Sequence, residues 1–355
     1  MKMFDPHLRR LTRLSTLAAH TLVALLAISC ARHPSIPAPA PTTHAWVFPT
    51  ASWDSIGDPR SLGWSPAGLD SVRDKLATLP STGFMAVIGG RILMSYGDTD
   101  TVSYIASVRK SVLSMMIGNY VKRGTVDLDK SLAQLGMDDL GGLTDQEKQA
   151  TVKDLLTARS GVFHEASNGG DDLASAPPRG SQPHGRYYLY SNWDFNALGA
   201  AFEIMTKRDI YDALESDIAR PIGMQDFNRA SHRKTGDSTK SRYLAYHMNF
   251  STRDMARIGY LMLRGGQWDG RQVVPADWVS ESTRPFTRVT DMNPIRRREG
   301  PFGYGYLWWV WDGPHASGAY AGAYTGLGAI GQHITVMPAL DLVVAHKTVP
   351  GQVDS

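Results

Sequence analysis

The segment Ser107-Val-Arg-Lys110 leads directly into the run Ser111-Val-Leu-Ser-Met-Met-Ile-Gly-Asn-Tyr-Val121. This run is apolar at helical spacing and ends near Gly124, so it predicts a buried helix that begins at Ser107. On such a helix the lysine lies one turn after the serine, and the two side chains share a face. A serine hydroxyl becomes a nucleophile at neutral pH when a neighbouring base takes its proton. A lysine whose pKa is lowered by burial or by a cationic neighbour can be that base.

A second Ser-x-x-Lys sequence, Ser231-His-Arg-Lys234, shows that the motif by itself is not specific for an active site. It lies in the polar run 229–240, which has no helical pattern behind it and is predicted to be a surface loop. The copy at Ser107 gains meaning from two further segments. Tyr190-Ser-Asn192 supplies a phenol that can relay protons and an amide that can bind a carbonyl group. The glycine-rich stretch 326–338 predicts a strand edge where backbone N–H groups can approach a substrate closely.

Together these segments resemble the serine β-lactamase-related family, which includes class C β-lactamases, penicillin-binding proteins, family VIII esterases and 6-aminohexanoate-dimer hydrolases. The resemblance covers roughly residues 53–348. It implies an α/β (α+β) fold of the β-lactamase/transpeptidase type, with an antiparallel sheet flanked by helices and a mostly helical insert. Four further segments support it, in the expected order: Asp154–Gly161, Pro221–Met224, Ser251–Gly259 and Phe302–Trp309.

The alternation of residue types independently predicts the same architecture. Residues 84–96 alternate around a Gly-Gly pair, which is typical of a β-hairpin, and a short helix is expected before them over 69–79. Residues from about 107 to 285 are mostly helical in pattern, and strands return over 303–348. Strands at both ends of the chain predict one antiparallel sheet, with the helical insert packed against it and the active site in the seam. The clearest late strands are expected over 304–311 and 334–337.

The resemblance also implies the roles of individual side chains. Ser107 forms an acyl-enzyme with an ester or amide substrate, while Lys110 and Tyr190 share the general base and acid steps. Asn192 is a candidate substrate-binding residue, and the backbone N–H groups of Ser107 and of Gly328-Ala329-Ile330 are candidate oxyanion donors. No metal or organic cofactor is required, and the histidines show no metal-binding spacing.

One departure from the family pattern bears on the substrate. β-Lactamases and penicillin-binding proteins usually carry Lys-Thr-Gly on the strand facing the serine, and that lysine helps to hold the substrate carboxylate. The corresponding stretch here, Ala323-Tyr-Thr-Gly326, has no lysine. The pattern from Gly328 to Gln332 is closer to aminohexanoate-dimer hydrolases and related esterases. The sequence therefore predicts a serine hydrolase for a small ester or amide. The alternatives are a penicillin-binding carboxypeptidase or weak β-lactamase and, more distantly, a non-catalytic membrane-tethered binding protein.

Four polar residues have both a functional and a structural interpretation. His164 is a candidate contact for the substrate near the serine, or it forms a local hydrogen bond in its loop. Asp171 and Asp172 shape the cleft or select a cationic amine, or they are solvated. Arg109 is expected at the surface or in an ion pair rather than in the chemistry.

The N-terminus has the anatomy of a bacterial lipoprotein signal peptide over residues 1–29. A basic stretch through Arg13 precedes the apolar run 22–28, and Ala27-Ile-Ser-Cys30 resembles a lipobox. Cys30, the only cysteine, is then the site of lipid attachment, and a proline-rich tether follows over 30–52. The alternatives are an uncleaved membrane anchor or an ordinary secreted protein.

We therefore expect an exported, membrane-anchored lipoprotein that faces the periplasm or the cell surface, with its hydrolase domain over 53–355. Relatives usually add a C-terminal helix over one sheet face, and such a helix is expected to be missing here. The net charge of +3 comes from residues 1–29, which carry four basic residues and one acidic residue. The remaining chain is electrically balanced, which gives no indication of nucleic-acid binding.

Overall fold

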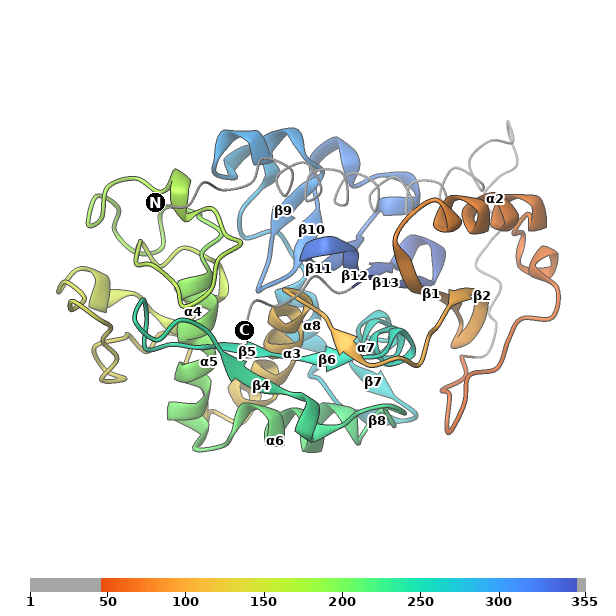
Figure 1. Ribbon diagram of the computed structural model, residues 1–355, viewed down its shortest axis with the longest axis horizontal. Helices are drawn as coiled ribbons and strands as arrows, with labels where there is room; N and C mark the ends of the chain where they lie inside the picture. Colours follow the sequence, from red (N-terminus) through yellow and green to blue (C-terminus); the bar gives the residue numbers. More distant parts are fainter. Residues whose placement is uncertain (1–45, 350–355) are drawn as a thin grey trace.

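The computed structural model describes residues 46–349 and is drawn in Figure 1. Its centre is a seven-stranded antiparallel sheet in the order β2-β1-β13-β12-β11-β10-β9. The strands are β1 (Ser81–Ile88), β2 (Arg91–Gly97), β9 (Phe302–Tyr304), β10 (Trp309–Trp311), β11 (Tyr324–Gly328), β12 (Gln332–Met337) and β13 (Leu342–Thr348). The predicted signal peptide, Cys30 and the first part of the predicted tether lie outside the described residues and stay predictions.

The helices and three small two-stranded sheets, β3-β6, β4-β5 and β7-β8, complete the described chain. The α-helices are α2 (Pro66–Ala77), α3 (Val108–Lys122), α4 (Val152–Leu156), α5 (Asn192–Thr206), α6 (Ile210–Leu214), α7 (Thr252–Leu263) and α8 (Ala276–Ser282). The short strands are β3 (Ser103–Tyr104), β4 (Arg233–Thr235), β5 (Ala245–His247), β6 (Asn249–Phe250), β7 (Gln267–Trp268) and β8 (Arg271–Gln272). None of the described helices is both long and apolar enough to cross a membrane.

Strand β1 shows how the sheet is held between two helical layers. Its side chains alternate, because successive residues of a strand point to opposite faces. Phe84, Ala86 and Ile88 join a core cluster with α2, whereas Met85 and Val87 join the larger cluster that contains α3 and α7. Figure 1 shows α2 and α7 on opposite sides of this strand. The fold class is the predicted one, and the first and last segments of the described chain pair within a single sheet.

Helix α7 can lie close to the sheet because its contact residue is a glycine. A Cβ atom at Gly259 would lie 2.4 Å from Cγ1 of Val343 and 2.9 Å from Cγ2 of Ile334. The N-terminus of this helix is capped by the Ser251 hydroxyl, which accepts a hydrogen bond from the Asp254 N–H group at 3.1 Å. Helix α7 thereby packs directly on one face of β12 and β13, and this face also borders the helical insert.

The two predicted strand regions near the chain ends have different outcomes. The hairpin over 84–96 is confirmed, and its two glycines have the positive φ values, 56° and 82°, that such a turn requires. The single strand expected over 304–311 is wrong, because the chain turns between β9 and β10, which pair with each other. Tertiary contacts hold this turn: the Leu307 N–H group donates to the Leu156 carbonyl at 3.2 Å. A Cβ atom at Gly305 would lie 2.3 Å from the Ser282 carbonyl oxygen.

Candidate active site

Ser107 is the N-cap residue of α3, and Lys110 lies one turn further along the same helix. The preceding residue, Ala106, has a φ of 50°, which is the left-handed region and costs a non-glycine residue of order 1–3 kcal/mol. Both Ala106 and Ile105 are buried, so the surrounding packing holds this conformation. The sharp turn brings the serine directly onto the start of a helix that is buried on nearly all sides.

The amino group of Lys110 is the centre of the site. Its Nζ atom lies 3.0 Å from Ser107 Oγ, 2.6 Å from the Tyr190 hydroxyl and 2.7 Å from Asn192 Oδ1. The lysine is only 1% exposed. Two segments of the sequence, one with Ser107 and Lys110 and the other with Tyr190 and Asn192, therefore meet around one nitrogen atom.

These contacts can satisfy a neutral amine. Asn192 Oδ1 can only accept a hydrogen bond, whereas the hydroxyls of Ser107 and Tyr190 can donate or accept. Burial lowers the pKa of Lys110 well below its ordinary value, the positive charge of Arg109 lowers it further, and Asp171 opposes the shift. Nζ can therefore donate to the amide oxygen and to one hydroxyl while its lone pair accepts the proton of the other. That is the arrangement needed for general-base catalysis.

Tyr190 stays protonated in the same surroundings. Burial raises the pKa of its phenol to about 12, although its hydrogen bond with Ser107 opposes the shift. Its ring packs against Phe195, with 4.8 Å between ring centroids, and against Trp309, with 5.3 Å. A phenol held in place and protonated can pass a proton between the lysine and a leaving group.

Asn192 orients the lysine rather than presenting a free amide. Its Nδ2 atom donates to the Gly169 carbonyl at 2.7 Å, and its backbone N–H donates to Asp171 Oδ2 at 2.9 Å. A carbonyl oxygen cannot donate, so the nitrogen of the amide must face Gly169 and its oxygen must face Lys110. Both side-chain polar atoms of Asn192 are already hydrogen-bonded within the protein, and the binding of a substrate carbonyl by this amide stays a prediction.

The expectation that Arg109 lies at the surface or in an ion pair is wrong. The side chain is buried, with the residue 2% exposed. Its Nη2 atom donates to Asn196 Oδ1 at 3.2 Å, and its guanidinium lies 4.3 Å from the centre of the Tyr246 ring. Among residues 46–349 no carboxylate forms an ion pair with it. The sequence pattern failed here because α3 is buried on all sides from Val108 to Gly118, so Arg109 had no solvent-facing side of the helix to occupy.

We expect Arg109→Gln to shift the pH dependence of hydrolysis. The active enzyme needs neutral Lys110, so kcat/KM should fall as the pH drops through the pKa of this lysine. Removing the positive charge of Arg109 raises that pKa, because a like charge no longer disfavours the ammonium form. The acid limb of a plot of kcat/KM against pH should therefore move to higher pH.

Two matched variants control this measurement. Arg109→Lys keeps a positive charge at the position and should restore most of the wild-type profile. Arg123→Gln removes a charge from the exposed C-terminal end of the same helix and should leave the limb in place. An acid limb that does not move in Arg109→Gln would contradict the assigned effect of this charge on Lys110.

Strand β11 approaches the start of α3 through its glycines. A Cβ atom at Gly328 would lie 2.7 Å from the Ile105 carbonyl oxygen, and one at Gly326 would lie 3.2 Å from Ser111 Oγ. Ala329 and Ile330 follow in a short 3-10 turn, where Ile330 has a φ of 64°. The predicted oxyanion segment thus begins beside the residues that lead into Ser107, and the binding of an oxyanion by its N–H groups stays a prediction.

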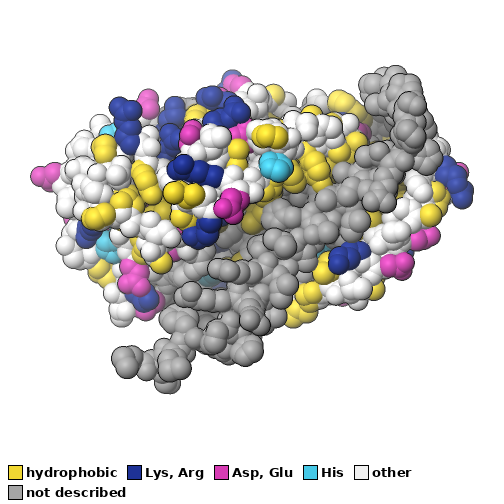
Figure 2. Space-filling model, turned by 90° about the horizontal axis from the view of Figure 1, so that it is seen from above, with side chains coloured by type: hydrophobic (Ala, Val, Ile, Leu, Met, Phe, Trp, Pro, Cys, Tyr) yellow, Lys and Arg dark blue, Asp and Glu magenta, His cyan; other side chains and the backbone are white. Residues whose placement is uncertain are grey.

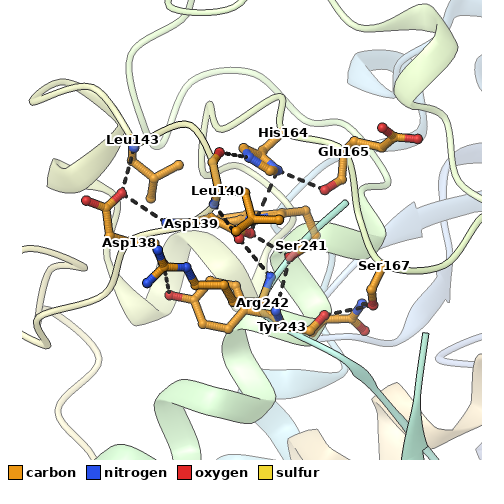
Figure 3. Close-up of polar contacts among 12 residues, drawn as sticks. Asp138, Asp139, Leu140, Leu143, His164, Glu165, Ser167, Ser241, Arg242 and Tyr243 are labelled. Carbon is orange, nitrogen blue, oxygen red and sulfur yellow. Dashed lines mark hydrogen bonds and ion pairs between the residues drawn. The ribbon is translucent and has the colours of Figure 1, made fainter. Parts of the chain in front are cut away.

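His164 belongs to a separate polar network, shown in Figure 3. Its two ring nitrogens each lie 2.8 Å from a backbone carbonyl oxygen, one of Leu140 and one of Glu165. Its Nδ1 atom is also 3.7 Å from Asp139 Oδ2. Within the described chain, none of its polar contacts is with the serine, lysine or tyrosine of the site. The local structural interpretation of this histidine is therefore the one the geometry supports.

Asp171 and Asp172 are not the solvated pair that one interpretation expected. Asp171 accepts hydrogen bonds from the backbone N–H groups of Leu173 and Asn192, and burial raises its pKa. Asp172 is 3% exposed and is bonded by Arg296 and Arg297. Both carboxylates therefore shape the wall of the site.

Arg297 is a site residue that the sequence analysis missed. It lies in a 3-10 turn, Ile295–Glu299, and its guanidinium carbon is 5.5 Å from the centre of the Tyr190 ring and 5.0 Å from that of Trp309. Three successive arginines, 296–298, are typical of an exposed charged turn, so the sequence carried no signal that the middle one lies against Tyr190.

The second Ser-x-x-Lys sequence is no active site. Ser231 Oγ donates to the Asn228 carbonyl at 2.8 Å, and Lys234 forms a surface ion pair with Glu203. The run is at the surface as predicted, although it contains the short strand β4. Within residues 46–349, no three His, Cys, Asp or Glu side chains lie close enough together to bind a metal ion.

Comparison with known proteins agrees with this geometry. The family model described as Beta-lactamase matches residues 70–346. The chain belongs to the β-lactamase family. A 6-aminohexanoate-dimer hydrolase of Paenarthrobacter ureafaciens is 23% identical over 88% of this chain and 89% of the relative.

Solved structures show the same fold. A candidate 6-aminohexanoate-dimer hydrolase from Bacillus anthracis aligns with a TM-score of 0.59 at 18% identity, over 85% of this chain and 84% of that one. A β-lactamase from Mycobacterium bovis aligns with a TM-score of 0.55 at 20% identity, over 79% of this chain and 92% of that one. Membership in the β-lactamase family and the hydrolases among its relatives support a serine hydrolase in general.

Proposed function

We propose that this protein cleaves an ester or amide bond through an acyl-enzyme on Ser107. The observation that carries the proposal is the single buried lysine nitrogen within 3.0 Å of the hydroxyls of both Ser107 and Tyr190. Such a cluster activates a serine, whereas a binding role alone does not require a buried lysine whose pKa is lowered.

Each step of the proposed reaction has a residue in position. Ser107 Oγ bonds to the substrate carbonyl carbon while its proton passes to Lys110, either directly or through Tyr190. The tetrahedral intermediate collapses, the bond to the leaving group breaks, and the leaving group takes the proton. Water then adds to the acyl-enzyme with Lys110 and Tyr190 again accepting and returning a proton, which releases the carboxylic acid and the free serine.

The residue at the position of the family's usual lysine favours a substrate that is an ester or amide other than a β-lactam. Tyr324 occupies that position in β11, and it is 4% exposed with its ring packed edge-on against Trp308. A buried tyrosine supplies no positive charge for a substrate carboxylate at this place. This supports an esterase or amidase over a dedicated β-lactamase, with hydrolysis of a β-lactam expected to be weak at most.

Covalent labelling tests the proposal. An alkyl fluorophosphonate reacts with activated serines, so intact-mass measurement should show one added group, and peptide mapping should place it on Ser107. Ser231 should stay unmodified, because its hydroxyl has only a backbone carbonyl as partner. Absence of labelling in folded protein that hydrolyses a nitrophenyl ester, or labelling at another residue, would exclude the assigned nucleophile.

A further inference from the structure

Arg297 places a positive charge beside Tyr190, and it shares its carboxylate partner with a second arginine. Its Nε atom donates to Asp172, and within residues 46–349 its guanidinium makes no other hydrogen bond. Its side chain is 27% exposed, so the terminal nitrogens remain open to a ligand. The ring centres of Tyr190 and Trp309 lie 5.5 Å and 5.0 Å from its guanidinium carbon, so the two rings restrict the orientation of the guanidinium group.

The local carboxylates compensate the charge of this guanidinium only in part. One carboxylate, Asp172, serves two arginines, because Arg296 bonds to its other oxygen. The second carboxylate, Asp171, already accepts from two backbone N–H groups. Arg109 adds a further buried positive charge below the site. The wall therefore has one carboxylate, Asp172, in contact with two guanidinium groups, which leaves one positive charge of these two arginines unmatched.

We propose that Arg297 binds a carboxylate group of the substrate, so that this hydrolase prefers esters or amides that carry a negative charge near the scissile bond. The inference rests on the proposed function and names its substrate class. A guanidinium presents two parallel N–H donors that match the two oxygens of a carboxylate. A single excess charge complements a monoanion. Figure 2 shows basic and acidic side chains interspersed on the visible face.

Matched substrate pairs test the proposal. One pair places the charge on the leaving group: 3-carboxyphenyl butyrate against its neutral isostere, 3-carbamoylphenyl butyrate. The other places it on the acyl group: the mono-4-nitrophenyl ester of adipic acid against that of adipamic acid. The readout is the ratio of kcat/KM for the charged and the neutral member, measured above the acid limb of the pH profile. We expect a ratio of roughly 10 to 100 in one pair, the range of one charge-assisted hydrogen bond.

Four further measurements assign the preference to Arg297. Arg297→Gln should lower the ratio to about one, and Arg297→Lys should restore part of it. Arg298→Gln, which removes a neighbouring exposed arginine bonded to Met292 and Asn293, should leave the ratio as in the wild type. In the wild type alone, added salt should reduce the ratio, because screening weakens a partly exposed charge pair.

The possible outcomes separate this inference from the proposed function. A wild-type ratio near one in both pairs, or a ratio that Arg297→Gln does not lower, would overturn the role of Arg297 while the neutral esters still report hydrolysis. A salt-independent ratio would also overturn it, and this result does not depend on any variant folding. If the wild type hydrolyses none of these esters and the fluorophosphonate does not label Ser107, the proposed function itself is rejected.

Discussion

Ser107→Ala is expected to reduce ester hydrolysis by roughly three orders of magnitude or more while leaving the fold intact. The variant removes the atom that bonds to the substrate, and no other described serine lies within hydrogen-bonding distance of Lys110 Nζ. The loss should fall on kcat, because the acyl-enzyme can no longer form. Residual rate should equal what the oxyanion donors and binding alone provide.

The chain offers its own control for this experiment. Ser231→Ala changes the serine of the second Ser-x-x-Lys sequence, whose hydroxyl bonds only to a nearby backbone carbonyl. Its activity should equal that of the wild type. Circular dichroism and thermal unfolding of both variants separate loss of chemistry from loss of fold. Full turnover in folded Ser107→Ala would remove Ser107 from the mechanism.

Lys110→Met is expected to lower kcat by roughly 10²- to 10⁴-fold, the usual contribution of a positioned general base. Methionine fills a similar volume but has no amine, so neither Ser107 nor Tyr190 retains a base within reach. Lys234→Met removes an exposed lysine at the equivalent place of the second motif and should leave kcat unchanged. Wild-type kcat in Lys110→Met would show that another group activates the serine.

The same variant has a signature in stability. Burial lowers the pKa of Lys110 in the folded protein below its ordinary value of 10.5. Between these two pKa values the unfolded chain binds more protons than the folded one, so the free energy of unfolding gains a contribution that rises with pH. Lys110→Met lacks this contribution. The difference in unfolding free energy between the two proteins should therefore change with pH in that window, and a constant difference would show that the lysine pKa is not lowered.

The sequence predicted the larger elements because each has a strong local signal. The helix after Ser107 shows in an unbroken apolar run, and the hairpin over 84–96 shows in alternation around two glycines. The exception is the 304–311 stretch, whose aromatic residues suit a strand. Its turn is held by contacts with Leu156 and Ser282, which are far away in the sequence.

The part of the site that lies within one sequence motif could be predicted. The part that depends on contacts between distant segments could not. Ser107 and Lys110 are neighbours on one helix, so their contact follows from helical geometry. The burial of Arg109 and the approach of Arg297 to Tyr190 depend on elements at least 87 residues apart along the chain. Local polarity predicts both arginines at the surface, and packing overrides it.

The sequence by itself determined that this chain forms an α+β sheet with a helical insert and carries a serine and a lysine one turn apart. Only the tertiary structure decided that the lysine is buried against Tyr190 and Asn192, with the charge of Arg109 beside it. The physical reason is that spacing along a helix is set locally by backbone hydrogen bonds. A pKa, in contrast, is set by every charge and by the loss of water around a group, and these exist only once distant segments have packed.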